Sequence, residues 1–181
     1  DSGGWQERFA ERVRLLEHAG FDALIVHVRF FEDKFKRRAR HELVPWAVSL
    51  TRLPVIANGD LGGPEDVAAL SEFLRSASGI MIGRHAIARP WLFAAWDRAL
   101  DVDHRRLWLR MCQSIQEEVP PEIALRRVRM FTKYFAANFA FGHPFAVAIA
   151  NAPSLSEARQ RALDFFERSP AIVRRPMVAG L

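Results

Sequence analysis

An alternation between amphipathic segments and short apolar runs in the first 100 or so residues constrains the fold more than any other feature of this sequence. The apolar runs have the length of strands buried on both faces and are Ala23–His27, Pro54–Ala57 and Gly79–Ile82. The segments around them have helical periodicity and are Gln6–Ala19, His41–Leu50, Pro64–Leu74 and Pro90–Leu100. This order is typical of β/α units and predicts a parallel sheet in an α/β fold.

The pattern changes after Asp101, where strand-like runs cease. The remaining chain contains four segments with helical patterns, which are Asp103–Glu118, Glu122–Phe141, Pro144–Asn151 and Ser154–Ser169. Prolines and a glycine mark the joints between them. We therefore expect an α/β domain over residues 1–101 and an all-α helical bundle domain over residues 102–181.

The charge is distributed unevenly between these two parts. Residues 1–102 hold 14 Lys+Arg and 14 Asp+Glu, whereas residues 103–181 hold 12 and 7, so the formal charge of +5 lies in the second part. Such an asymmetry indicates that the C-terminal part binds a polyanion. A solvated, arginine-rich helix surface remains the alternative.

Cellular context is indicated by what the sequence lacks. Cys112 is the single cysteine, which excludes an internal disulfide and suits a reducing compartment. The sequence has no apolar stretch long enough to span a bilayer, and its first residues do not resemble a signal peptide. We expect a cytoplasmic protein with no membrane partner and no metal site.

Small and polar residues follow each predicted strand. They are His27-Val28-Arg29, Asn58-Gly59-Asp60 and Gly83-Arg84. Because ligands bind at the C-terminal ends of strands in β/α barrels, and a phosphate is commonly held there by the last two loops, this pattern predicts a phosphate-containing ligand. Taken singly, Asn-Gly-Asp is also an ordinary turn sequence and His27 also suits a core histidine.

The same segments resemble those of the tRNA-dihydrouridine synthase family. The first stretch, Ala19 to Arg29, is similar to the family's AGADALTVHGR. The second, Pro54 to Asp60 followed by Pro64-Glu65-Asp66, is similar to PVIANGD…PED. The third, Gly79 to Arg84 followed by Pro90-Trp91-Leu92-Phe93, is similar to GVMIGR…NPWLF. The motifs occur in the family's order and spacing over residues 19–93.

This resemblance implies the last three β/α units of a TIM barrel, followed by the family's helical tRNA-binding domain. It implies FMN as cofactor, NADPH as reductant and tRNA uridine as substrate. The implied cofactor-binding residues are His27, Arg29, Asn58, Gly59, Asp60, Gly83 and Arg84. Val28 and Phe30 depart from the family's glycine and threonine, and Val28 is expected to crowd the phosphate approach.

The resemblance implies no catalytic residue within these 181 residues. The family's acid cysteine and flavin-contacting lysine belong to strands that precede the resembling segment, and Cys112 does not match either position. We therefore expect the chain to be inactive alone and to require an N-terminal half-barrel, in cis or from a partner.

Two basic segments are candidates for RNA contact. The first lies in the loop after the first strand and contributes Lys34, Lys36, Arg37 and Arg38; the second lies on one predicted helix and contributes Arg126, Arg129 and Lys133. A solvated surface is the alternative for both. Another phosphate-binding FMN barrel oxidoreductase, an isomerase of phosphorylated metabolites and a non-catalytic tRNA-binding remnant remain alternative functions. The targeted uridine and the oligomeric state stay open.

Overall fold

The computed structural model of the chain describes residues 4–33 and 37–178. The chain folds as two compact units, residues 1–83 (unit 1) and 84–181 (unit 2). This division differs from the predicted boundary near residue 101, because the segment after the third strand packs against helices of unit 2.

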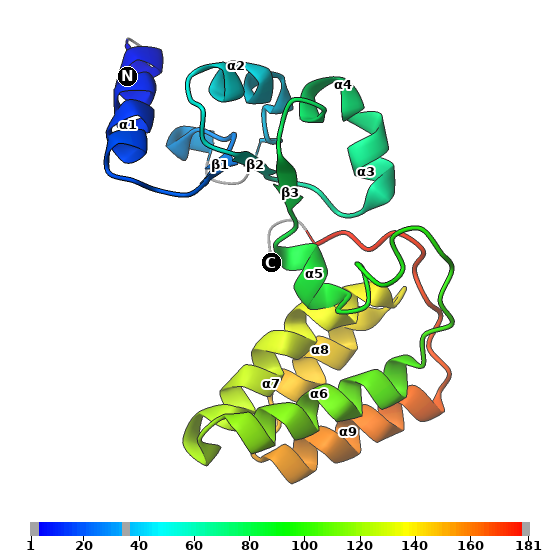
Figure 1. Ribbon diagram of the computed structural model, residues 1–181. Helices are drawn as coiled ribbons and strands as arrows, with labels where there is room; N and C mark the ends of the chain where they lie inside the picture. Colours follow the sequence, from blue (N-terminus) through cyan, green and yellow to red (C-terminus); the bar gives the residue numbers. More distant parts are fainter. Residues whose placement is uncertain (1–3, 34–36, 179–181) are drawn as a thin grey trace. The chain divides into compact units, whose positions relative to one another are not determined.

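Unit 1 contains a three-stranded parallel sheet in the order β1-β2-β3 (Figure 1). Its elements are α1 (Trp5–His18), β1 (Leu24–His27), η1 (Phe31–Asp33), η2 (His41–Leu43), α2 (Val44–Ser49), β2 (Val55–Asn58), α3 (Pro64–Ala69), α4 (Ser71–Leu74) and β3 (Gly79–Met81). The three strands and the β/α order agree with the sequence prediction. The predicted helix over Pro64–Leu74 is divided in two at Leu70, whose φ of −106° is not helical.

Alternation along the strands gives the sheet one covered face. Leu24, Val55 and Ala57 are buried, together with Val44 and Ala47 of α2. By contrast, Ile25 of β1 is 58% exposed. Helices therefore cover one face of the sheet, while the other face of β1 is accessible.

Unit 2 is helical and has a core rich in aromatic residues. Its elements are α5 (Arg84–Ala88), α6 (His104–Glu118), α7 (Pro121–Phe135), η3 (Ala136–Asn138), α8 (Gly142–Ala150) and α9 (Leu155–Glu167) (Figure 1). Asp103 caps α6 through the Arg106 amide, and Ser154 caps α9 through the Glu157 amide. Trp108 is fully buried and donates from Nε1 to Thr132 Oγ1 over 2.9 Å, so its one polar atom is satisfied inside the core.

The predicted helix over Pro90–Leu100 is wrong. These residues form successive turns, and the helical segment lies earlier, at α5. Buried Asn138 donates from Nδ2 to the Ala88 carbonyl at the end of α5, and Trp91 packs against His104 and Phe135. These tertiary contacts override the amphipathic pattern.

The predicted helix over Glu122–Phe141 is too long. In the structure α7 ends at Phe135 and continues as a single 3₁₀ turn, η3. The chain then folds back so closely that a Cβ built on Gly142 would lie 1.8 Å from the Ala136 carbonyl oxygen. This contact requires glycine and ends the helix before Phe141. Among the described residues, none of the helices has the length and apolarity needed to cross a membrane.

Candidate functional site

The strand ends of unit 1 meet at one edge of the sheet. The Cα of His27 pairs with that of Asn58, and Asn58 pairs with Met81. Asn58 Nδ2 also donates to the Met81 sulfur over 3.1 Å, which links the two strand ends. The structure thus brings His27 and Asn58 together at the edge where β/α folds bind ligands.

Gly59 allows a close approach between the turn after β2 and the end of β1. Its φ is +123°, and a Cβ built there would lie 2.8 Å from His27 Cδ2 and 2.7 Å from the Ala39 Cβ. A side chain at position 59 would therefore strike both neighbours as well as require a strained backbone. The glycine keeps the His27 ring directly against the Gly59 backbone.

Arg29 and Asp60 link the segment after β1 to the same turn. The Arg29 guanidinium donates to the Asp60 carboxylate in an ion pair, and the Arg29 side chain is 5% exposed. The Ala39 amide donates to Asp60 Oδ2 over 2.7 Å. Asp60, at a φ of +49°, therefore acts as a cross-link within the protein. Contact of these two residues with a cofactor stays a prediction.

His41 lies behind this turn and was not a candidate from the sequence. Its side chain is buried, and its ring nitrogens make no well-formed hydrogen bond among the described residues. Burial lowers its pKa below 6.5, while the nearby Gly59 backbone and Asp60 carboxylate oppose the shift. A neutral imidazole therefore supports the turn. No sequence pattern distinguishes it from an ordinary residue of the amphipathic segment that it begins.

The other predicted cofactor residues, Gly83 and Arg84, lie where the chain passes from unit 1 to unit 2. Gly83 ends unit 1 and a Cβ there would meet nothing within 4 Å, whereas Arg84 is the first residue of α5 in unit 2. The convergence of Arg84 with His27 and Asn58 stays a prediction. Val28, expected to crowd the site, is buried and lines a cavity together with Val26.

The basic loop after β1 is only partly described. Lys34 and Lys36 lie outside the described residues. Arg37 has a 75% exposed side chain and an ion pair of 3.7 Å with buried Asp33, and Arg38 is exposed. Both arginines are therefore accessible to a polyanion.

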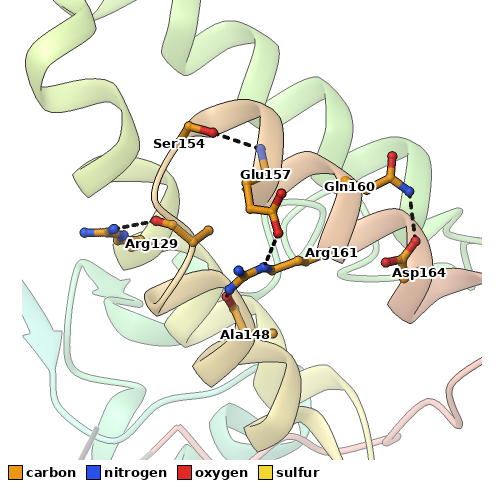
Figure 2. Close-up of polar contacts among 8 residues, drawn as sticks. Arg129, Ala148, Ser154, Glu157, Gln160, Arg161 and Asp164 are labelled. Carbon is orange, nitrogen blue, oxygen red and sulfur yellow. Dashed lines mark hydrogen bonds and ion pairs between the residues drawn. The ribbon is translucent and has the colours of Figure 1, made fainter.

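Arg129 has a different environment from the other candidate RNA contacts. Arg126 and Lys133 of α7 are exposed. Arg129 is half-buried and donates from Nη2 to the Ala152 carbonyl over 2.6 Å, while Arg161 donates to the Ala148 carbonyl over 2.9 Å (Figure 2). The Ala148 carbonyl belongs to the last turn of α8, where carbonyls have no partner within the helix, and the Ala152 carbonyl follows two residues after the helix ends. Arg129 thus holds α7 to the end of α8.

Among the described residues, neither Cys112 nor a metal-binding cluster provides an alternative reactive centre. Cys112 is buried in the core of unit 2, and burial raises the pKa of its thiol to about 12. The thiol therefore remains protonated at neutral pH. The described residues contain no cluster of three or more His, Cys, Asp or Glu side chains suited to a metal ion.

Comparison with known proteins connects both units to one family. The family model described as dihydrouridine synthase matches residues 4–169. The tRNA-dihydrouridine synthase B of Pseudomonas putida is 36% identical over 139 residues, which are 76% of this chain and 37% of that protein. The tRNA-dihydrouridine synthase B of Pectobacterium carotovorum is 28% identical over 172 residues, covering 86% of this chain and 53% of the relative. The chain therefore spans roughly a third to a half of the length of these relatives.

Proposed function

Because the chain belongs to the dihydrouridine synthase family, we propose that it takes part in the reduction of uridine to dihydrouridine in tRNA. The relatives from Pseudomonas putida and Pectobacterium carotovorum bear the name of this activity. The family match runs through both units and not only through the sheet. It therefore favours this function over another phosphate-binding barrel, which would share only the strand ends.

We also propose that unit 1 corresponds to the last three β/α units of a TIM barrel. The parallel order β1-β2-β3 and the helices between the strands support this assignment. Under it, the accessible face of β1, with Ile25 and His27, is the face that lines a barrel interior.

The strand ends fit the phosphate end of FMN, the cofactor that the family resemblance implies. The observation that carries the proposal is the register that places His27 beside Asn58 at the strand ends, followed by the glycine turn that packs against the His27 ring. Glycine lets the turn approach the histidine closely, and this edge of a parallel sheet is where β/α folds bind ligands. When bound, FMN supplies hydride transfer between NADPH and the uracil ring.

The residues of this chain would bind and orient the cofactor. His27 and Asn58, held in register on adjacent strands, would present polar groups towards it. The ion pair of Arg29 with Asp60, supported by the Ala39 amide, would keep the turn in place. Asp60 would thus position the turn through its ion pair with Arg29, and its own contact with the cofactor stays a prediction.

Unit 2 would provide part of the tRNA-binding surface. Exposed Arg126 and Lys133 share one face of α7, because they are seven residues apart, and exposed Arg127 lies beside that face. The net positive charge of the chain comes from residues 103–181. Positive side chains on one helix face suit the RNA backbone, whose contacts are electrostatic and depend on salt.

The proposal is tested by the dihydrouridine content of tRNA. Deletion of the gene that encodes this chain should abolish dihydrouridine at one or more tRNA positions, measured by mass spectrometry of digested tRNA. Re-expression of the intact gene should restore it, whereas the Asn58→Ala variant should restore it poorly. An Arg75→Ala variant, changed at an exposed residue away from the strand ends, is the matched control. Unchanged dihydrouridine at every position after deletion would refute the function.

A further inference from the structure

Unit 1 contains a cavity of about 670 Å³ between α1, the end of β1 and α2. Phe9 of α1, Val26 of β1 and Ala47 of α2 are among its lining residues. Its volume lies within the range of small-molecule sites, which is roughly 300–1,000 Å³. A cavity of this size can enclose a mononucleotide.

This cavity is a different place from the turn at Gly59. It is lined by Val26 and Val28, whose side chains alternate along the chain with that of His27. His27 and Arg29 also line it, but Asn58, Gly59 and Asp60 do not. The cavity thus shares two residues with the candidate cofactor site but does not include the turn after β2.

Aromatic rings form one wall of the cavity. Trp5 lies edge-on to both Phe30 and Trp46, with ring centroids 4.9 and 5.3 Å apart, and Phe9 lies 5.4 Å from Trp46. Neither indole ring of this wall is fully buried, since Trp5 and Trp46 are both partly exposed. Accessible aromatic rings in a charged pocket are the features on which unpaired bases stack.

The charge of the lining is positive. Arginines 8, 12, 29, 37 and 40 line the cavity, against the carboxylates of Glu32 and Asp33. Asp33 is buried and already pairs with Arg37 and Arg40, at 3.7 Å each. Among the described residues no carboxylate forms an ion pair with Arg12, which leaves its guanidinium available for an anion.

We propose that this cavity binds one unpaired nucleotide of an RNA strand, with the base against Trp46 and a phosphate on Arg12. Exposed Arg37 belongs to the lining and exposed Arg38 follows it outside the lining, so that neighbouring phosphates of a strand also find positive partners. The choice of RNA rests on the proposed function, whereas the affinity for a nucleotide does not.

The test is calorimetric titration of the whole chain with uridine 5′-monophosphate. Arg12→Ala should weaken binding about tenfold, the loss expected for one charged phosphate contact. Arg14→Ala is the matched control, because it removes the same charge from the same helix at a residue that does not line the cavity. Circular dichroism of both variants verifies that they fold. Equal affinities of the two variants would overturn the proposal, as would the absence of binding to the folded chain.

Further ligands separate the nucleotide from simpler explanations. Inorganic phosphate should compete only at much higher concentration, and hexauridylate should bind more tightly than the mononucleotide. If inorganic phosphate competes as well as the mononucleotide does, the cavity is only an anion site. If hexauridylate binds no more tightly than the mononucleotide, the cavity does not bind an RNA strand. Either result overturns the proposal. Loss of binding in Asn58→Ala would place the nucleotide at the turn and also overturn it. Failure of the proposed function appears separately, as unchanged dihydrouridine in tRNA.

Discussion

Gly59 is the residue on which the candidate site depends most directly. Its φ of +123° and its contact with His27 both exclude a side chain. We expect Gly59→Ala to lower the free energy of unfolding of unit 1 by about 2 kcal/mol or more, because backbone strain and collision add. Urea denaturation followed by tryptophan fluorescence measures this change.

Gly20→Ala separates the two causes. Gly20 also has a positive φ, of +81°, but a Cβ there would meet nothing within 4 Å. In this variant the free energy of unfolding should therefore fall only by the cost of the backbone strain, about 1 kcal/mol. Equal losses at both positions would show that the contact of Gly59 with His27 contributes nothing.

Arg129 and Arg126 are expected to respond differently to the same substitution. Arg129→Ala leaves the Ala152 carbonyl without its donor and should lower the free energy of unfolding by about 1–3 kcal/mol. Arg126→Ala, at an exposed position, should leave stability unchanged and reduce the salt dependence of tRNA binding by about one ion. Thermal unfolding and filter binding at several salt concentrations measure the two effects. If Arg126→Ala lowered the stability and Arg129→Ala changed only the salt dependence of tRNA binding, both assignments would be wrong.

The burial of His41 predicts a pH dependence of stability. Its pKa is lowered in the folded chain, so the unfolded chain binds the proton more readily, and the free energy of unfolding should fall as the pH falls below about 6.5. His104 in unit 2 shifts in the same direction. His41→Leu should therefore reduce, but not abolish, the loss of stability between about pH 7.5 and about pH 5.5. Denaturation at both pH values measures it, and an unchanged loss in the variant would contradict the assignment.

At the scale of elements, the turn from α7 into α8 depends on Gly142. A Cβ there would lie 1.8 Å from the Ala136 carbonyl oxygen, which belongs to the backbone and cannot rotate away. Gly142→Ala should destabilise unit 2 by more than about 3 kcal/mol, because η3 would have to unwind. Circular dichroism during thermal unfolding measures this. Gly83→Ala, where a Cβ meets nothing within 4 Å, should cost far less.

Elements with strong local patterns were predictable, and those shaped by distant contacts were not. The runs that became β1, β2 and β3 were recognisable because strands of parallel sheets are short apolar runs. Their expected burial on both faces was wrong, since Ile25 of β1 is 58% exposed and Met81 of β3 is 40% exposed. The segment Pro90–Leu100 has a helical pattern but forms turns, since Trp91 packs into the core of unit 2 and Asn138 holds the preceding α5. The pattern of these eleven residues carries no information about Asn138 or about the core residues that Trp91 contacts.

At the scale of the whole molecule, the two units differ in the size of the side chains that they bury completely. Unit 2 fully buries Trp108, Phe135 and Phe145 in one aromatic cluster, whereas the largest fully buried side chain among the described residues of unit 1 is Val44. We expect backbone amides of unit 1 to exchange hydrogen faster than those of the core helices of unit 2, because local opening there costs less free energy. Hydrogen exchange with mass spectrometry measures it. Equal protection of the backbone amides from exchange in both units would show that the units do not differ in stability.

The sequence by itself determined the order of the strands and helices, the glycine turn after β2 and the family to which these segments belong. Each of these is encoded in neighbouring residues, through apolar periodicity, the backbone freedom of glycine and the spacing of motifs. Only the tertiary structure decided that Asp60 pairs with Arg29, that His41 lies buried behind Gly59 and that Arg129 binds a helix end. These contacts join residues that are 18 to 31 positions apart. Their formation depends on strand register and helix packing, which the local sequence does not specify.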